Sequence, residues 1–147
     1  NLLTGGIPSS YGDHSSLVWL DVSGNSLGGQ LPQDLSALPF LTTLMVSNNM
    51  FTGELPEFLP PTLTDANFSN NLLTGGIPSS YGDHSSLVWL DVSGNSLGGQ
   101  LPQDLSALPF LTTLMVSNNM FTGELPEFLP PTLTDANFSN NLLTGGI

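Results

Sequence analysis

Three residues with the chemistry of a hydrolase stand side by side: Asp13, His14 and Ser15 supply an acid, a base and a nucleophile. A serine–histidine–aspartate triad requires these groups to face one another, and known triads bring them together from distant segments of the chain. Consecutive residues in one segment do not produce that geometry. The sequence therefore predicts no catalytic residue and a protein that is not an enzyme.

Carboxylates dominate the charge, since 12 Asp and Glu and no Lys or Arg give a formal net charge of −12. No segment carries the Asp-x-Asp-x-Asp-Gly spacing of a calcium loop, so we predict no metal and no cofactor. A chain without basic residues neither neutralises nucleic-acid phosphates nor binds anionic lipid. It also has no apolar run of the length that crosses a bilayer. These features exclude nucleic acid as a partner, and they also exclude direct insertion into a membrane.

Asparagine offers a different chemistry, the attachment of sugar. The segments Asn67-Phe68-Ser69 and Asn137-Phe138-Ser139 match the Asn-x-Ser/Thr acceptor sequence. We predict glycosylation at Asn67 and Asn137 if the protein is secreted. The alternative is a chance match, because Asn and Ser are abundant in this chain.

An internal repeat carries all of these residues. Asn1–Asn70 recurs as Asn71–Asn140 without a substitution, and Asn141–Ile147 begins a third copy. Each unit divides into segments at 1–24, 25–48 and 49–70. Repeats of this length are typical of solenoids, in which each coil buries its apolar face only against its neighbours. We predict a single solenoid of about six coils over 1–147, an excerpt of a longer array that is either a natural fragment or an engineered concatemer.

The segments share one frame. In the first, Leu17, Leu20, Val22, Asn25 and Leu27 spell L-x-x-L-x-L-x-x-N-x-L, and Gly-x-Leu/Ile-Pro follows each such Asn. This frame resembles the plant-type leucine-rich repeat. The resemblance implies a β-rich solenoid of the α/β type, a right-handed superhelix with a parallel sheet on its concave face and an irregular or 3-10 convex side. Family members include receptor ectodomains, cell-wall inhibitors and surface adhesins, which implies an extracellular protein: secreted, on the cell surface or in the cell wall.

Alternation within the segment Leu17–Ser23 predicts a strand that is buried on one face. Leu20 and Val22 point inward, whereas Trp19, Asp21 and Ser23 point to solvent. Because successive strands pair in parallel, the outward residues form the columns Trp19, Thr43, Asp65 and Asp21, Met45, Asn67, which recur in the second unit. An exposed aromatic residue beside carboxylates is suited to bind a sugar, a peptide or a protein, and the alternative is a solvated sheet face. The candidate binding residues on this concave face are Trp19, Asp21, Met45, Asp65, Trp89, Asp91, Met115 and Asp135.

The Asn that ends each frame has a structural role. Its amide donates and accepts hydrogen bonds toward backbone groups where the chain leaves the strand, including those of the next coil. Replacement by Leu leaves such groups unpaired, at about 1–3 kcal/mol each. The predicted buried ladder consists of Asn25, Asn49, Asn71, Asn95, Asn119 and Asn141.

The back of each coil is less regular. His14 aligns with Leu38 of the next segment, which predicts a partly buried histidine at the edge of the core. Phe40 and Phe58 fall at convex positions. Local packing on this irregular side is the favoured explanation for them, and an exposed stripe for lateral contacts is the alternative.

Identity of the 70-residue copies is the strongest indication of function. A repeated surface suits multivalent contacts, and head-to-tail contacts between coils propagate open arrays. We therefore predict a structural or adhesive extracellular protein that forms or belongs to a filament, with other copies of the array, extracellular proteins or glycans as partners. The alternative is the ligand-binding ectodomain of a receptor or inhibitor, recognising a peptide, glycan or protein. Ice binding is a weaker possibility, because the outward columns mix Trp, Asp and Met instead of repeating Thr or Asn.

Overall fold

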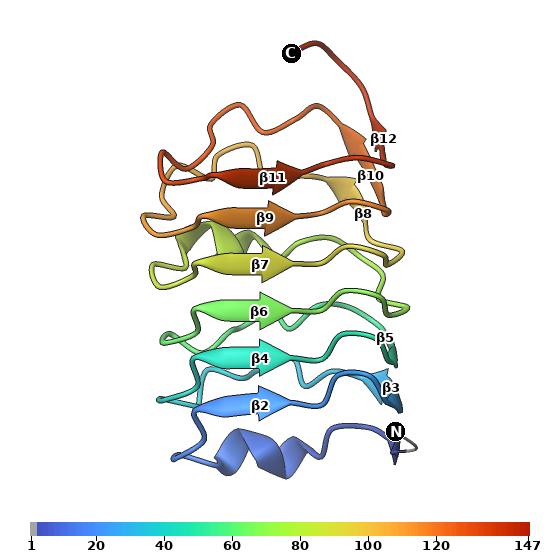
Figure 1. Cartoon of the computed structure of the whole chain (residues 1–147), viewed down its shortest axis with the longest axis vertical. Coiled ribbons are helices and arrows are strands. Elements are labelled where there is room, and N and C mark those ends of the chain that lie inside the picture. Colours follow the sequence, from blue (N-terminus) through green and yellow to red (C-terminus); the bar gives the residue numbers. More distant parts are fainter. Residues whose placement is uncertain (1–2) are drawn as a thin grey trace.

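The chain winds into a solenoid of stacked coils (Figure 1). The structure, a computed structural model, describes residues 3–147, so the first two residues of the predicted 1–147 solenoid lie outside the described part. Each coil contributes one short strand to a continuous sheet, and the strands lie one above another like rungs. The leucine-rich-repeat solenoid predicted from the sequence is confirmed.

The main sheet has six parallel strands in the order β11-β9-β7-β6-β4-β2. Its strands are β2 (Trp19–Asp21), β4 (Thr43–Met45), β6 (Asp65–Asn67), β7 (Trp89–Asp91), β9 (Thr113–Met115) and β11 (Asp135–Asn137). The central residue of each strand points inward, and Leu44, Ala66 and Leu90 are buried. The pairing places Trp19 beside Thr43 and Thr43 beside Asp65, which confirms the predicted columns.

Two smaller parallel sheets, not predicted from the sequence, form where the chain runs away from each Asn. One contains β1 (Thr4–Gly5), β3 (Ser26–Gln30) and β5 (Met50–Thr52), and the other contains β8 (Gly98–Gln100), β10 (Met120–Gly123) and β12 (Leu142–Leu143). Backbone hydrogen bonds also connect the coil between them, because the Thr74 N–H donates to the Gly53 carbonyl at 2.8 Å. The coils are therefore tied together along two walls.

The convex side is irregular and carries two short 3-10 helices, η1 (Ser9–Asp13) and η2 (Ser79–Asp83), as the resemblance implied. The buried Tyr81 in η2 donates its hydroxyl hydrogen to the Pro56 carbonyl at 2.8 Å, which fastens this side of the coil to its predecessor. Burial raises the pKa of the Tyr81 hydroxyl well above its ordinary value, so it remains a donor.

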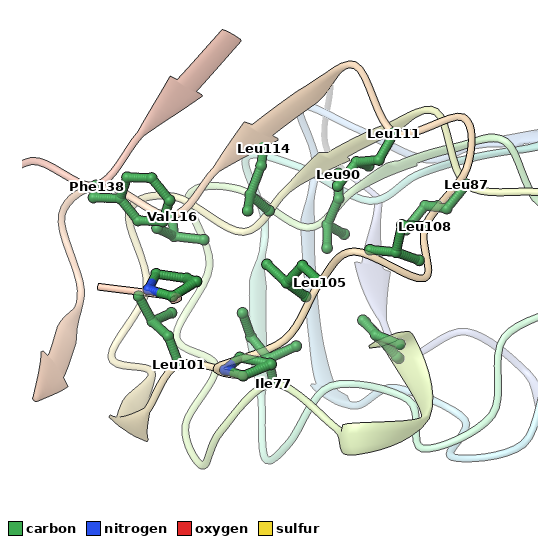
Figure 2. Close-up of a pocket in the computed structure, with 13 residues that line it drawn as sticks. Ile77, Leu87, Leu90, Leu101, Leu105, Leu108, Leu111, Leu114, Val116 and Phe138 are labelled. Atoms are coloured by element: carbon green, nitrogen blue, oxygen red, sulfur yellow. The ribbon is translucent and has the colours of Figure 1, made fainter. Parts of the chain in front are cut away.

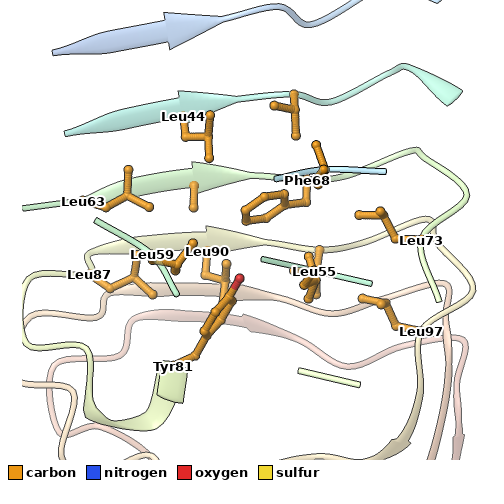
Figure 3. Packing of buried hydrophobic residues seen from close by; sticks show 14 of the residues in the cluster. Leu44, Leu55, Leu59, Leu63, Phe68, Leu73, Tyr81, Leu87, Leu90 and Leu97 are labelled. Carbon is orange, nitrogen blue, oxygen red and sulfur yellow. The ribbon is translucent and has the colours of Figure 1, made fainter. Parts of the chain in front are cut away.

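The core runs along the solenoid axis between these walls (Figure 3). Leucines from every coil stack on one another, and Phe51, Phe68 and Phe121 are fully buried. Each of these side chains contacts neighbouring coils, so the core holds consecutive coils together and fixes the spacing of the strands.

Candidate functional site

The solvent face of the main sheet, here called the sheet face, carries all eight candidate binding residues. The two columns continue into the second unit without a break: Asp65 pairs with Trp89, and Asn67 pairs with Asp91. Trp19 is 64% exposed in the first strand, whereas Trp89 is half-buried between its neighbours. The face therefore presents aromatic rings beside carboxylates on a rigid sheet.

Neighbouring hydroxyl and amide groups fix the carboxylates of this face. Asp91 Oδ1 accepts hydrogen bonds from the Ser93 N–H at 2.9 Å and the Ser93 hydroxyl at 2.6 Å. Asp65 Oδ2 accepts from the Thr64 hydroxyl at 2.6 Å. Each carboxylate thus has one oxygen held in place, while the described residues offer no hydrogen bond to the other, Asp91 Oδ2 or Asp65 Oδ1.

Asp21 has the same arrangement at the first strand. The Ser23 hydroxyl donates to Asp21 Oδ1 at 2.6 Å and the Ser23 N–H at 2.9 Å. The hydroxyl hydrogen bond, with a smaller effect of the N–H, holds the pKa of the Asp21 carboxyl below its usual 3.8. Asp21 is therefore ionised on the exposed face at neutral pH.

The serine two residues after each strand is more buried than predicted. Ser23, expected to point to solvent, is half-buried, and its equivalents Ser47 and Ser69 are buried. The chain bends at the next residue: Asn48 has φ 55° and Asn70 has φ 54°, both in the left-handed region that Asn and Gly tolerate best. The Asn or Gly before each ladder Asn was the sequence signal for this bend.

Five of the six asparagines of the predicted ladder, all but Asn25, donate a hydrogen bond to the preceding coil, whereas the bonds that Asn25 donates among the described residues stay within its own bend. Asn71 Nδ2 donates to the carbonyl oxygens of Phe68 at 3.1 Å and Ser69 at 3.3 Å, and also to that of Val46, in the preceding coil, at 3.1 Å. Asn71 Oδ1 accepts from the Phe51 N–H at 3.0 Å. The contacts thus reach the preceding coil and not the next one, which corrects the predicted direction. Burial is also uneven: Asn49, Asn71 and Asn119 are buried, whereas Asn25, Asn95 and Asn141 are half-buried.

The two glycosylation candidates lie on the sheet face. Asn67 is half-buried in β6 and Asn137 is exposed in β11. Asn67 Oδ1 accepts from the Ser69 N–H at 2.9 Å, while its Nδ2, the atom that would carry sugar, makes no hydrogen bond among the described residues. A ladder residue such as Asn71 differs, because its Nδ2 makes three. Attachment of sugar at Asn67 would therefore break no hydrogen bond donated by Nδ2.

We predict that the chain carries N-linked glycan at Asn67 and Asn137 when it passes through a eukaryotic secretory pathway. Intact mass measured before and after enzymatic deglycosylation should shift by two glycans, and Asn67→Gln should remove one. Asn70→Gln is the matched control, because Asn70 lies three residues away outside an acceptor sequence and should leave the mass shift unchanged. An unmodified secreted chain would contradict the prediction.

The Asp13-His14-Ser15 segment is best described by its second copy, which has a neighbouring coil on both sides. His84 is half-buried at the edge of the core, as predicted for this position, and its Nε2 lies 2.8 Å from the Pro60 carbonyl oxygen. His14 is exposed instead, because no described coil supplies an equivalent carbonyl. Its ring contacts Tyr11 edge to face, with centroids 5.9 Å apart.

Metal sites, membrane-spanning helices and interior ligand cavities find little support within residues 3–147. No group of three or more His, Cys, Asp and Glu side chains in that range is arranged to hold a metal ion. No helix in the same range is long and apolar enough to cross a membrane. The interior space lined by Ile77, Tyr81 and Leu105 is apolar and only about 20 Å³ in volume (Figure 2). That is close to the minimum for one water, so the core has no room for an organic ligand.

The convex phenylalanines differ from the favoured expectation. Phe40 is 60% exposed and Phe58 is 52% exposed, and their copies Phe110 and Phe128 have the same values. Local packing therefore does not cover them, since both rings project from the irregular side of the coil. They provide exposed aromatic residues away from the sheet face.

Stacked parallel strands with an asparagine at each corner define a leucine-rich-repeat solenoid. The family model described as Leucine Rich Repeat matches residues 16–38, 40–61, 86–108 and 110–131. These segments cover more than half of the chain, which belongs to the leucine-rich-repeat family. Its repeats are of the plant type, because they are similar to those of Arabidopsis receptor-like proteins and receptor-kinase ectodomains.

Receptor-like protein 31 of Arabidopsis thaliana is 36% identical over 84 residues, which are 55% of this chain and 10% of that protein. The chain thus spans about a tenth of this relative. Among solved structures, the ectodomain of the Arabidopsis receptor kinase HAESA, in complex with an N-terminally extended IDA peptide hormone ligand, has a TM-score of 0.86 at 28% identity. The match covers 100% of this chain and 29% of that one. A plant ice-binding protein has a TM-score of 0.84 at 31% identity, covering 96% and 46%.

Proposed function

We propose that this chain is a ligand-binding segment of an extracellular plant-type leucine-rich-repeat protein, and that a polypeptide ligand lies across the sheet face. The observation that carries the proposal is the row of exposed or half-buried Trp and Asp residues on a rigid parallel sheet. The HAESA ectodomain, similar along the full length of this chain, is described with a peptide hormone ligand.

The sheet face has the physical properties of a binding surface. Tryptophan gives a large contact area at a low entropic cost, and such residues account for much of the energy in protein interfaces. Trp19 and Trp89 project from strands whose backbones are hydrogen-bonded to neighbouring strands. The backbone positions that carry the two rings are thus set before a ligand arrives, which reduces the cost of binding.

Extracellular placement and membership of a longer array belong to the same proposal. Relatives such as Receptor-like protein 31 are about ten times the length of the matched region. The acceptor sequences at Asn67 and Asn137 fit passage through a secretory pathway. The predicted filament finds no support in the relatives described above, so self-association of this chain stays a prediction.

Ice binding is less well supported, although a plant ice-binding protein shares the fold. A regular array of Thr or Asn on a flat face was the feature expected for it. The outward columns of the main sheet alternate Trp, Thr and Asp in one case and Asp, Met and Asn in the other.

A display library of random linear peptides, selected on the immobilised chain, tests the proposed function. We expect binders whose affinity falls at least about tenfold for the Trp19→Ala/Trp89→Ala variant, because loss of an aromatic anchor costs more than about 1.4 kcal/mol. Phe40→Ala/Phe110→Ala is the matched control, since it removes two exposed aromatic rings, one from each unit, from the convex side. Selection of no binder, or of binders lost only in the Phe variant, would reject the proposal.

A further inference from the structure

We infer that the sheet face selects a cationic extended polypeptide whose basic side chains recur at every fourth residue. This inference rests on the proposed function and specifies the ligand. It starts from the junction of the two 70-residue units, where Asp65, Trp89 and Asp91 come together. Asp65 is the register partner of Trp89 in the adjacent strand, and Asp91 lies two residues further along the strand of Trp89.

Trp89 stands at the corner of this cluster, with Asp65 beside it in the adjacent strand and Asp91 next to it on the same face of its own strand. Adjacent strands lie about 4.8 Å apart, and alternate residues of one strand about 6.6 Å apart on the same face. Both carboxylates are therefore within reach of a cation placed over the Trp89 ring. A cation in this position gains from the ring face and from both carboxylates.

The carboxylates of both Asp residues are already oriented before a cation binds. Asp65 and Asp91 each have one oxygen held by a neighbouring hydroxyl, Thr64 or Ser93. The other oxygen of each is left without a hydrogen bond from the described residues. An arriving guanidinium or ammonium group would thus meet acceptors that need little rearrangement.

Charge complementarity decides what kind of ligand fits. The whole chain contains no Lys or Arg and has a net charge of −12, so no side-chain cation of its own neutralises the face other than a protonated histidine. His84 is directed to the Pro60 carbonyl at the core edge, and His14 packs against Tyr11 in the first coil, before the first strand of the sheet. The ligand must supply the positive charge, and the exposed ring favours Arg or Lys over a fully hydrated ion.

The 70-residue repeat sets the spacing of the basic residues in the ligand. Trp19 and Trp89 are separated by three strand-to-strand steps, from β2 through β4 and β6 to β7. Three steps correspond to about 14 Å, and four residues of extended polypeptide cover about 13–14 Å. Side chains four residues apart in an extended chain also project to the same side. A ligand that crosses the strands would therefore place a basic residue over each Trp.

The test compares synthetic nine-residue peptides by Trp fluorescence and calorimetry on the full chain. One peptide has Arg at positions 3 and 7 among Ser and Thr; the second has the same composition with the two Arg contiguous; in the third, Gln replaces Arg. We expect the spaced peptide to bind about tenfold more tightly than the contiguous one, and the Gln peptide to show no binding at the same concentrations.

Matched variants distinguish the local contacts of Asp65 and Asp91 from the effect of the chain's net charge on binding. Asp65→Asn/Asp91→Asn should weaken the spaced peptide about tenfold. Asp34→Asn/Asp104→Asn makes the same charge change on the other side, where each Asp accepts an N–H and a hydroxyl hydrogen bond from Ser36 or Ser106, as Asp91 does from Ser93. This control should weaken binding less than about twofold at physiological salt.

Two results would overturn the inference: equal affinity for the spaced and contiguous peptides, or an equal loss of affinity in the Asp34/Asp104 control. Either result would mean that binding depends only on the net charge of the two molecules. Neutral library peptides that depend on Trp19 and Trp89, with no binding of the Arg peptides, would overturn it while leaving the proposed function intact. Absence of binding by library and Arg peptides alike would reject both.

Discussion

Phe68→Ala is expected to lower the free energy of unfolding by about 3–5 kcal/mol, the largest effect of any single substitution considered for this chain. Phe68 is fully buried and lies with Leu44, Val46 and Leu20 around the core of the first unit. Removal of the ring leaves a cavity that the coils above and below cannot fill without moving closer together, and hydrogen bonds along two walls fix their spacing. Urea denaturation followed by circular dichroism measures the change.

Phe138→Ala is a matched control inside the same molecule. Phe138 has the same neighbours in sequence but is only half-buried in the last coil. Its replacement should cost clearly less, about 1–2 kcal/mol. Equal losses at the two positions would show that burial between coils does not stabilise this solenoid, and the packing described for Phe68 would then be wrong.

Asn71→Leu should have the second-largest effect, a loss of about 2–4 kcal/mol. The side chains have similar volumes, so the effect is one of hydrogen bonding. The Val46 and Phe68 carbonyls retain bonds from Asn49 and Asn95 respectively. The Phe51 N–H loses its acceptor inside the core. That one unpaired donor accounts for about 1–3 kcal/mol, and the lost bonds of Nδ2 supply the rest.

Asn67→Leu is the control for this prediction. The free energy of unfolding of both Leu variants is measured by urea denaturation. Asn67 loses one hydrogen bond, from the Ser69 N–H, at a half-buried position on the sheet face. The expected change is within about 1 kcal/mol. If both Leu variants were equally stable, the asparagine ladder would not contribute to stability as its contacts indicate.

The sequence was sufficient to predict the main sheet because its two signals agree. Alternation around Leu20 fixes which side chains face inward, and the repeat length fixes which residues are neighbours across strands. Together they place Asp65 beside Trp89, although these residues belong to different units. A slip of one residue would have exposed Leu20 and Leu44, so burial leaves little freedom of register.

Features that depend on contacts between unlike segments could not be predicted in this way. The smaller sheets include Gly28 and Gly29, residue types that seldom mark strands, and they form because β3 and β5 are already held in register. The exposure of Phe40 depends on the path of the irregular side, which no periodic pattern describes. The direction of the Asn71 contacts depends on which coil lies nearer to its amide.

The ligand is the least predictable part of the site. Residue types on the face indicate an aromatic and acidic surface, and the register adds Asp65 of the adjacent strand to the Asp91 that already follows Trp89 in its own strand. Orientation of their carboxylates by Thr64 and Ser93 depends on rotamers that the sequence does not fix. The preference proposed for a basic ligand follows from these two structural facts together.

One distance tests most directly the claim that the six strands form a single parallel sheet in this register. The chain contains no cysteine, so spin labels at Trp19→Cys and Asp135→Cys would be the only ones present. These positions are five strand-to-strand steps apart. Pulsed electron paramagnetic resonance should give one distribution centred near about 24 Å. A mean distance beyond about 35 Å, or two separate distributions, would contradict the sheet and the binding face built on it.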